Sequence, residues 1–150
     1  MPYRICKTFE VENGHMLSKH PDRCRFPHGH TRRVEIVVES ASLDANEMVC
    51  DFKAVKGWIS EYLDALDHAM CMNTGDHAYT EMRSRYGDRV VGFEGRDPTT
   101  EVMAEEIFRR VQTGMSEHRA TGGVYGLRDS VRLVSVRLWE TSSSWAEYFE

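Results

Sequence analysis

The sequence predicts an α+β domain, because segments with a period of two near both ends enclose two segments with a helical period. A length of 150 residues, with 41% hydrophobic and 29% charged residues, is typical of one domain with its own core. We therefore expect a single domain over residues 1–150 in the order β-β-α-α-β-β, with two helices on one face of an antiparallel sheet.

The first two predicted strands lie near the N-terminus. Residues 3–13 carry apolar side chains mostly at alternate positions, and residues 31–40 read TRRVEIVVES. In the second segment Val34, Ile36 and Val38 share one face, while charged side chains occupy the other. This alternation predicts half-buried antiparallel strands that pair as a hairpin.

Two amphipathic helices follow. In residues 53–66 apolar side chains recur at steps of three and four, which predicts the first helix. The sequence 97-DPTTE-101 predicts the start of the second, since proline suits the first turn and Asp or Thr can cap it. We expect Gly114 and the cluster 121-TGG-123 to end that helix.

The remaining segments are less regular. Residues 74–97 are polar and contain several glycines, which predicts a long loop with room for a short strand around Val90–Phe93. Residues 131–140, VRLVSVRLWE, predict a further strand, and residues 145–150 a short final one.

Charge and composition narrow the classes of function. The net charge is −5 and no run of Lys or Arg occurs, so nucleic acid is not an expected partner. No apolar run approaches the roughly 18 residues that a membrane span needs, and the N-terminus lacks the apolar core of a signal peptide. We expect a cytoplasmic protein whose four scattered cysteines are free thiols.

One stretch of sixteen residues holds four histidines and one cysteine: 15-HMLSKHPDRCRFPHGH-30. His28 and His30 point to the same side of an extended chain, and the hairpin would bring His15 beside them. Three neutral imidazoles with one open position are typical of catalytic zinc. Cys24 would either close the site as a fourth ligand or stand near the metal as a base, and His20 fits an ordinary loop histidine. The alternative is a chance pair of surface histidines.

Five motifs in order span residues 15 to 141. They are His15 with 24-CRFPHGH-30, then 48-MVCDF-52, 66-LDH-68, 98-PTTE-101 and 138-LWET-141. The set resembles the 6-pyruvoyltetrahydropterin synthase/6-carboxytetrahydropterin synthase family. That resemblance implies the tunnelling fold, in which three subunits join their sheets into an intersubunit barrel and two trimers stack into a hexamer. It also implies active sites between subunits and a zinc ion (Zn²⁺) on His15, His28 and His30.

The position of Cys24, four residues before the H-G-H run, resembles the 6-carboxytetrahydropterin synthase branch. This implies conversion of 7,8-dihydroneopterin triphosphate to 6-carboxytetrahydropterin, acetaldehyde and triphosphate, an early step toward queuosine. Cys24 would then act as a thiolate base, and Asp67 with His68 as a proton relay. The alternatives are a 6-pyruvoyltetrahydropterin synthase, another pterin side-chain lyase, or a pterin- or metal-binding paralogue without turnover.

The resemblance also assigns residues to the pterin ring. Glu140 would anchor it by accepting hydrogen bonds from the 2-amino group and a ring N–H. Thr99 and Thr100 would help, although both fit helix caps equally well.

The sequence departs from the family pattern in two places that bear on the site. The pair 13-NG-14 precedes the first histidine in place of two small residues, and the stretch 74–97 is long for the family. A triphosphate also needs cations. Lys19, Arg25, Arg32 and Arg33 are near in sequence but fit solvated surface charge as well.

Overall fold

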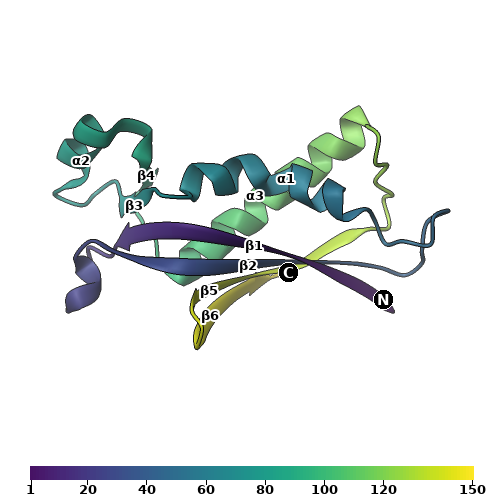
Figure 1. Cartoon of the computed structure of the whole chain (residues 1–150), viewed down its shortest axis with the longest axis horizontal. Coiled ribbons are helices and arrows are strands. Elements are labelled where there is room, and N and C mark those ends of the chain that lie inside the picture. Colours follow the sequence, from purple (N-terminus) through teal and green to yellow (C-terminus); the bar gives the residue numbers. More distant parts are fainter.

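The computed structural model describes residues 1–150 and contains a six-stranded sheet with three α-helices (Figure 1). The strand order across the sheet is β4-β3-β1-β2-β5-β6. In chain order the elements are β1 (Tyr3–Met16), the 3₁₀ turn η1 (Arg23–Arg25), β2 (His28–Ser40), α1 (Phe52–Leu66), β3 (Met70–Asn73), α2 (Tyr79–Tyr86), the 3₁₀ turn η2 (Gly87–Arg89), β4 (Val90–Phe93), α3 (Thr100–Thr121), β5 (Arg132–Thr141) and β6 (Ser144–Phe149).

The long hairpin of β1 and β2 forms the centre of the sheet. Its strands pair antiparallel from Tyr3 opposite Ser40 to His15 opposite His28. The side chains of Val11, Val34 and their alternate neighbours are buried on one face, as the period of two predicts. The predicted hairpin is thereby confirmed. The strands β5 and β6 likewise confirm the two strands predicted near the C-terminus.

Helices α1 and α3 cover that buried face of the sheet (Figure 1). Asp51 caps α1 by accepting a hydrogen bond from the Lys53 amide at 2.8 Å, and Thr99 caps α3 by accepting one from the Val102 amide at 3.1 Å. Apolar side chains from both helices join those of the sheet in one cluster of 24 buried residues. The α+β class and the position of the two long helices are therefore as the sequence predicts.

The segment between α1 and α3 differs from the expected loop. It contains β3 and β4, which extend the sheet through parallel pairs, and the short helix α2. The sheet is therefore mixed, and a third helix lies beyond the end of α1 (Figure 1). The sequence hides β3 because its four residues, MCMN, show no alternation. It hides α2 because that helix buries none of its side chains and so has no apolar stripe.

Gly114 does not end the second long helix, which continues to Thr121. A Cβ atom at Gly114 would lie 2.6 Å from the carbonyl oxygen of Trp58 in α1. The glycine is therefore needed where the two helices approach each other, while Gly122, at φ 72°, caps the true end of α3.

No helix of the structure combines the length and the apolar character that crossing a bilayer requires. All four cysteines are unpaired, as expected.

Candidate metal centre

Three histidines form a compact cluster where β1 ends and β2 begins. In the antiparallel register His15 lies opposite His28 and Asn13 opposite His30, so the three imidazoles project from the same face of the hairpin. One ring nitrogen of each lies within 4.8 Å of the other two, and the ring centroids are 4.5, 5.0 and 5.1 Å apart. The hairpin therefore brings the three predicted ligands together.

Backbone carbonyls select the tautomer of two of these rings. Nδ1 of His15 lies 2.8 Å from the carbonyl oxygen of Pro98, and Nδ1 of His28 lies 2.8 Å from that of Phe26. Because a carbonyl oxygen can only accept, each Nδ1 carries the proton and each Nε2 keeps a free lone pair. A hydrogen bond from the ring nitrogen that does not bind the metal is typical of metal-bound histidines.

The spacing of the free nitrogens fits a cation. Nε2 of His15 and Nε2 of His30 are 3.2 Å apart, close to the ~3.3 Å that separates two ligands of a tetrahedral zinc ion with Zn–N bonds of about 2.0–2.1 Å. Two lone pairs at this distance repel each other unless a proton or a metal ion lies between them. Because all three ligands are imidazole nitrogens, the site suits zinc better than a hard, oxygen-preferring cation.

Burial favours the neutral form of two of these rings, His15 and His30. Burial lowers the pKa of His15 to about 4, and the positive charge of Arg32 lowers it further, against the hydrogen bond to Pro98. The pKa of His30 is also lowered, first by burial and then by Arg32. Both imidazoles are thus in the metal-binding form near neutral pH.

Arg32 lies beneath the cluster and not on the surface. Only 1% of it is exposed, and its Nη1 donates to the hydroxyl of Thr100 at 3.2 Å. That hydroxyl donates in turn to Oε1 of Glu140 at 3.1 Å. Sequence reasoning counted Arg32 among the neighbouring cations and missed its burial. The signal was available, because Arg32 has the same parity as Val34 and so belongs to the inner face of the strand.

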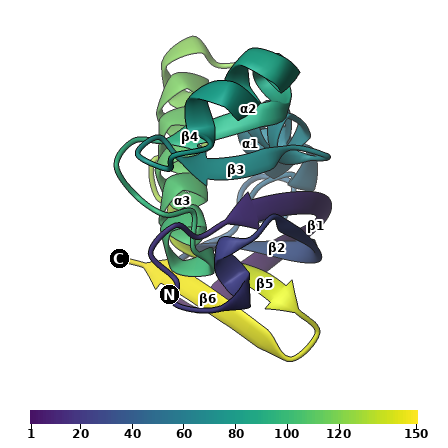
Figure 2. The same ribbon diagram turned by 90° about the vertical axis from the view of Figure 1, so that its left-hand side faces the viewer.

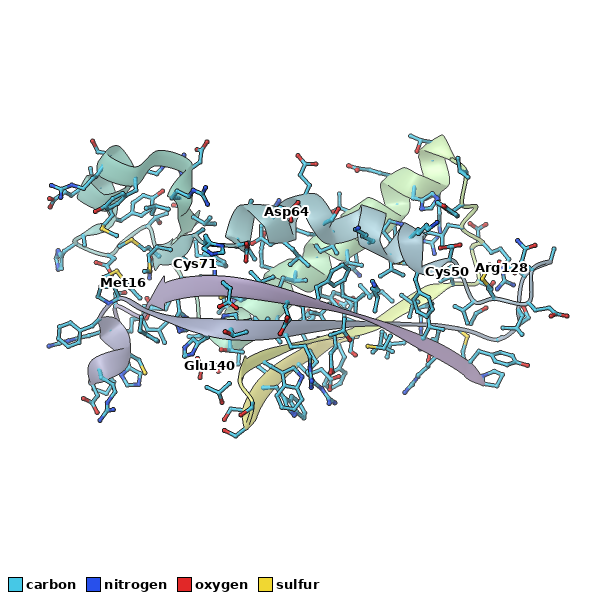
Figure 3. All side chains as sticks on the ribbon, in the orientation of Figure 1. Met16, Cys50, Asp64, Cys71, Arg128 and Glu140 are labelled. Carbon is cyan, nitrogen blue, oxygen red and sulfur yellow. The ribbon has the colours of Figure 1, made fainter.

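Glu140 lies beside the histidines as well as at the end of β5. Its Oε1 is 3.6 Å from Nε2 of His30 and 3.7 Å from Nε2 of His15. Figure 3 shows the carboxylate at the same end of the sheet as Met16 and Cys71, far from Cys50 and Arg128. A carboxylate in this position can offset the charge of a bound cation and can also accept hydrogen bonds from a substrate.

Asp67 and His68 follow directly on α1 and lie against β1. Asp67 accepts hydrogen bonds from the Glu12 amide at 2.8 Å and from Nδ1 of His68 at 2.8 Å, and together they lower its pKa. His68 therefore presents Nε2 to its surroundings, at a backbone φ of 59° that is rare for a residue other than glycine. Asn13 supports this turn, since its Nδ2 donates to the carbonyl oxygen of Leu66 at 2.9 Å.

Cys24 lies in the loop between β1 and β2, and Thr99 lies at the start of α3. Cys24 lies half-buried in η1, within the loop that joins His15 to His28, and is not one of the residues whose ligand atoms lie within 4.8 Å of one another. The geometry therefore favours a ligand set of three histidines over a closed site with a thiolate. Thr99 caps α3 through its hydroxyl, while Thr100 bridges Arg32 and Glu140.

Two cavities flank the cluster. The histidine cavity, of about 550 Å³, is lined by His28, His30 and His68 among others. The Glu140 cavity, of about 280 Å³, is lined by Thr100, Glu140 and Trp145, and also by the loop residue His20. The first has the size of a small-molecule site, so the metal centre has room for a substrate beside it.

Comparison with known proteins agrees with this geometry. The sequence profile of the family described as 6-pyruvoyl tetrahydropterin synthase matches residues 4–150. The chain belongs to this family. Among curated relatives in the family, the 6-carboxy-5,6,7,8-tetrahydropterin synthase of Aquifex aeolicus is 29% identical, with 100% of this chain and 99% of that protein covered. The protein of the same name from Synechocystis is 32% identical, with 97% and 92% covered.

Solved structures show the same fold. An uncharacterized protein from Wolinella succinogenes superposes with a TM-score of 0.75 at 22% identity, covering 99% of this chain and 98% of that one. The 6-pyruvoyl tetrahydropterin synthase of Plasmodium vivax superposes with a TM-score of 0.70 at 14% identity, again covering 99% and 98%. The subunit fold that the sequence motifs imply, that of the tunnelling-fold proteins, is therefore confirmed.

Proposed function

We propose that this protein is a zinc-dependent lyase that converts 7,8-dihydroneopterin triphosphate and water to 6-carboxytetrahydropterin, acetaldehyde and triphosphate. The observation that carries the proposal is the convergence of three imidazoles beside a substrate-sized cavity. The names of relatives that match the whole chain, such as the protein from Aquifex aeolicus, support this choice of substrate. Such a product would serve the early part of queuosine biosynthesis.

Zinc held by His15, His28 and His30 would act as a Lewis acid toward an oxygen of the pterin side chain. The chain itself would move the protons. Asp67 holds His68 in the tautomer whose Nε2 can accept a proton from a side-chain hydroxyl. Cys24, as a thiolate, would exchange a proton with a carbon atom of the same side chain.

The pterin ring would bind through its hydrogen-bonding edge. The Glu140 carboxylate accepts hydrogen bonds, and the Thr100 hydroxyl fixes one of its oxygens at 3.1 Å. A site built on such bonds rejects rings that lack the matching N–H groups, because its own polar atoms would then stay unpaired. Thr99 would contribute through its backbone at the start of α3.

A hexamer with intersubunit active sites is part of the proposal. Cys24 belongs to the loop between β1 and β2, whereas Asp67 and His68 belong to the turn after α1. The strand edges support assembly: β1 pairs with β3 only over Gly14–Met16 and Glu12 contacts the turn after α1, which leaves the outer edge of Tyr3–Val11 without a partner, and the outer edge of β6 is free too.

The direct test is incubation of the zinc-loaded protein with 7,8-dihydroneopterin triphosphate, with products read by mass spectrometry. We expect 6-carboxytetrahydropterin and acetaldehyde. A 6-pyruvoyl product would keep the metal chemistry and change the assignment to the enzyme for which the family is named. Absence of any product from protein with one zinc per chain would refute the proposed activity and favour a binding-only paralogue.

A further inference from the structure

The segment between β3 and α3 supplies one wall of the histidine cavity. Met82 and Tyr86 of α2 and Arg89 of η2 line it, together with His28, His30 and His68. Figure 2 shows α2, β3 and β4 standing over the end of the β1–β2 hairpin that carries the histidines. Residues that the sequence predicted as a plain loop therefore belong to the surroundings of the metal centre.

Arg89 is the one arginine of this segment without a hydrogen-bond or ion-pair partner. Arg83 pairs with Asp88 at 3.1 Å, Arg85 pairs with Glu81 at 3.7 Å, and Arg96 pairs with Glu105 at 3.1 Å. A cation on a cavity wall that forms no direct ion pair is available to an anion from solution.

The backbone holds Arg89 in place. The next residue, Val90, is 1% exposed and pairs with Met70 in the parallel ladder of β3 and β4, which sets Arg89 beside Ala69 and hence next to His68. Arg83 also donates from Nη1 to the Val90 carbonyl oxygen at 2.7 Å. Gly87, at φ 59°, makes the turn that brings the chain back from α2. The position of the guanidinium is therefore built into the sheet.

Arg89 is the only lysine or arginine that lines the histidine cavity. Glu12 is the only acidic residue that lines it, and the Thr31 hydroxyl lies 3.1 and 2.9 Å from the two oxygens of its carboxylate. The positive charge of Arg89 also reaches the proton-relay pair, since it adds to the hydrogen bonds that keep the pKa of Asp67 low.

We propose that Arg89 binds the oligophosphate group carried by the substrate side chain and holds it beside His68. This inference rests on the proposed function, and it makes Arg89 a substrate-binding residue supplied by the segment in which the chain departs most in length from its family. A planar guanidinium can bind two phosphate oxygens at once, which a lysine cannot reproduce.

Inorganic tripolyphosphate tests this without any need for turnover. Its dissociation constant for the zinc-loaded protein is measured by isothermal titration calorimetry for the wild type, Arg89→Ala, Arg89→Lys and the control Arg85→Ala. We expect Arg89→Ala to weaken binding at least about tenfold, Arg89→Lys to weaken it less, and the control to match the wild type. Equal binding by wild type and Arg89→Ala, or no binding by the wild type, would overturn the inference.

Kinetics separate this inference from the proposed function. With 7,8-dihydroneopterin triphosphate we expect Arg89→Ala to raise KM at least about tenfold while kcat changes little. Normal turnover and KM in Arg89→Ala would refute the role of Arg89 and leave the lyase activity standing. Conversely, Arg89-dependent binding of tripolyphosphate by a protein that gives no product would refute the activity and retain the anion site. Circular dichroism of each variant serves as the control for folding, and we expect the wild-type spectrum because Arg85 and Arg89 are both exposed.

Discussion

His28 and Cys24 lie close together in the sequence, yet their expected duties in the metal centre are different. His28 offers a free Nε2 within 4.8 Å of the other two ligand nitrogens, whereas Cys24 stands outside that group. We therefore expect His28→Ala to lower the zinc affinity more than about 100-fold. Removal of a group that only hydrogen-bonds to a ligand already lowers metal affinity about 10–100-fold. The test of this loss is the amount of zinc per chain, measured by mass spectrometry after dialysis against a chelator.

Cys24→Ala is the matched variant. We expect it to keep one zinc per chain while its turnover falls about 10²–10⁴-fold, the usual contribution of a positioned acid or base. Loss of zinc from Cys24→Ala would make the thiolate a fourth ligand and remove it from proton transfer. Retention of a full zinc by His28→Ala would sink the three-histidine assignment.

The sequence could predict the histidines but not what lies beneath them. His15, His28 and His30 follow from a hairpin whose register the alternation determines. The contacts of Arg32 with Thr100, and of Thr100 with Glu140, join residues 68 and 40 positions apart. Such contacts depend on how α3 packs on the sheet, which no local pattern encodes. Arg89 was hidden for the same reason, since the parallel pairing of β3 and β4 sets its position.

At the scale of elements, the crossing of α1 and α3 depends on the absence of one side chain. A Cβ at position 114 would meet the backbone of Trp58 at 2.6 Å, whereas a Cβ at Gly57, on the exposed side of α1, would meet nothing within 4 Å. We expect Gly114→Ala to destabilise the fold by about 1–3 kcal/mol through forced separation of the helices. Gly57→Ala should stabilise it by about 0.5–1 kcal/mol, the gain in helix propensity.

Urea denaturation of the two glycine variants shows whether helix–helix packing or helix propensity determines the effect of alanine on the free energy of unfolding. Both substitutions replace a helical glycine by alanine, so propensity alone would move both midpoints upward. Opposite shifts would show that the helix–helix contact dominates at position 114. An upward shift of both would mean that the helices separate without cost, and would contradict the close approach.

The long, periodic elements were predictable, whereas the short ones were not. Alternation over β1 and β2 and the three- and four-residue spacing in α1 follow from one buried face on each element. Three consecutive residues of β3 are buried, so both faces of this strand are covered and its sequence needs no alternation. The helix α2 buries nothing and is set by the turns at its ends, including Gly87.

At the scale of the whole molecule, the sheet has helices on one face only, and its other face carries charged side chains together with Trp139 and Trp145. That open face carries linked charges, with Glu35 near both Arg33 and Arg137, at 3.2 and 3.9 Å. Strand β1 presents its outer edge over most of its length. In a monomer the N–H and C=O groups of this edge would be exposed to water and could pair with other chains. We therefore expect an assembly in which sheet edges of different subunits pair.

One substitution tests edge pairing without disturbing the hairpin. The Glu12 amide donates outward to Asp67 and the Gly14 amide outward to the Ala69 carbonyl, so amides at even positions of β1 point away from β2. Thr8 has this parity, and proline there removes only an outward N–H. We expect Thr8→Pro to reduce a hexamer to smaller species in analytical ultracentrifugation while the wild-type circular dichroism is kept. Thr8→Ala, which retains the N–H, should assemble normally. A Thr8→Pro protein that still forms the wild-type oligomer would show that β1 edges do not join the subunits.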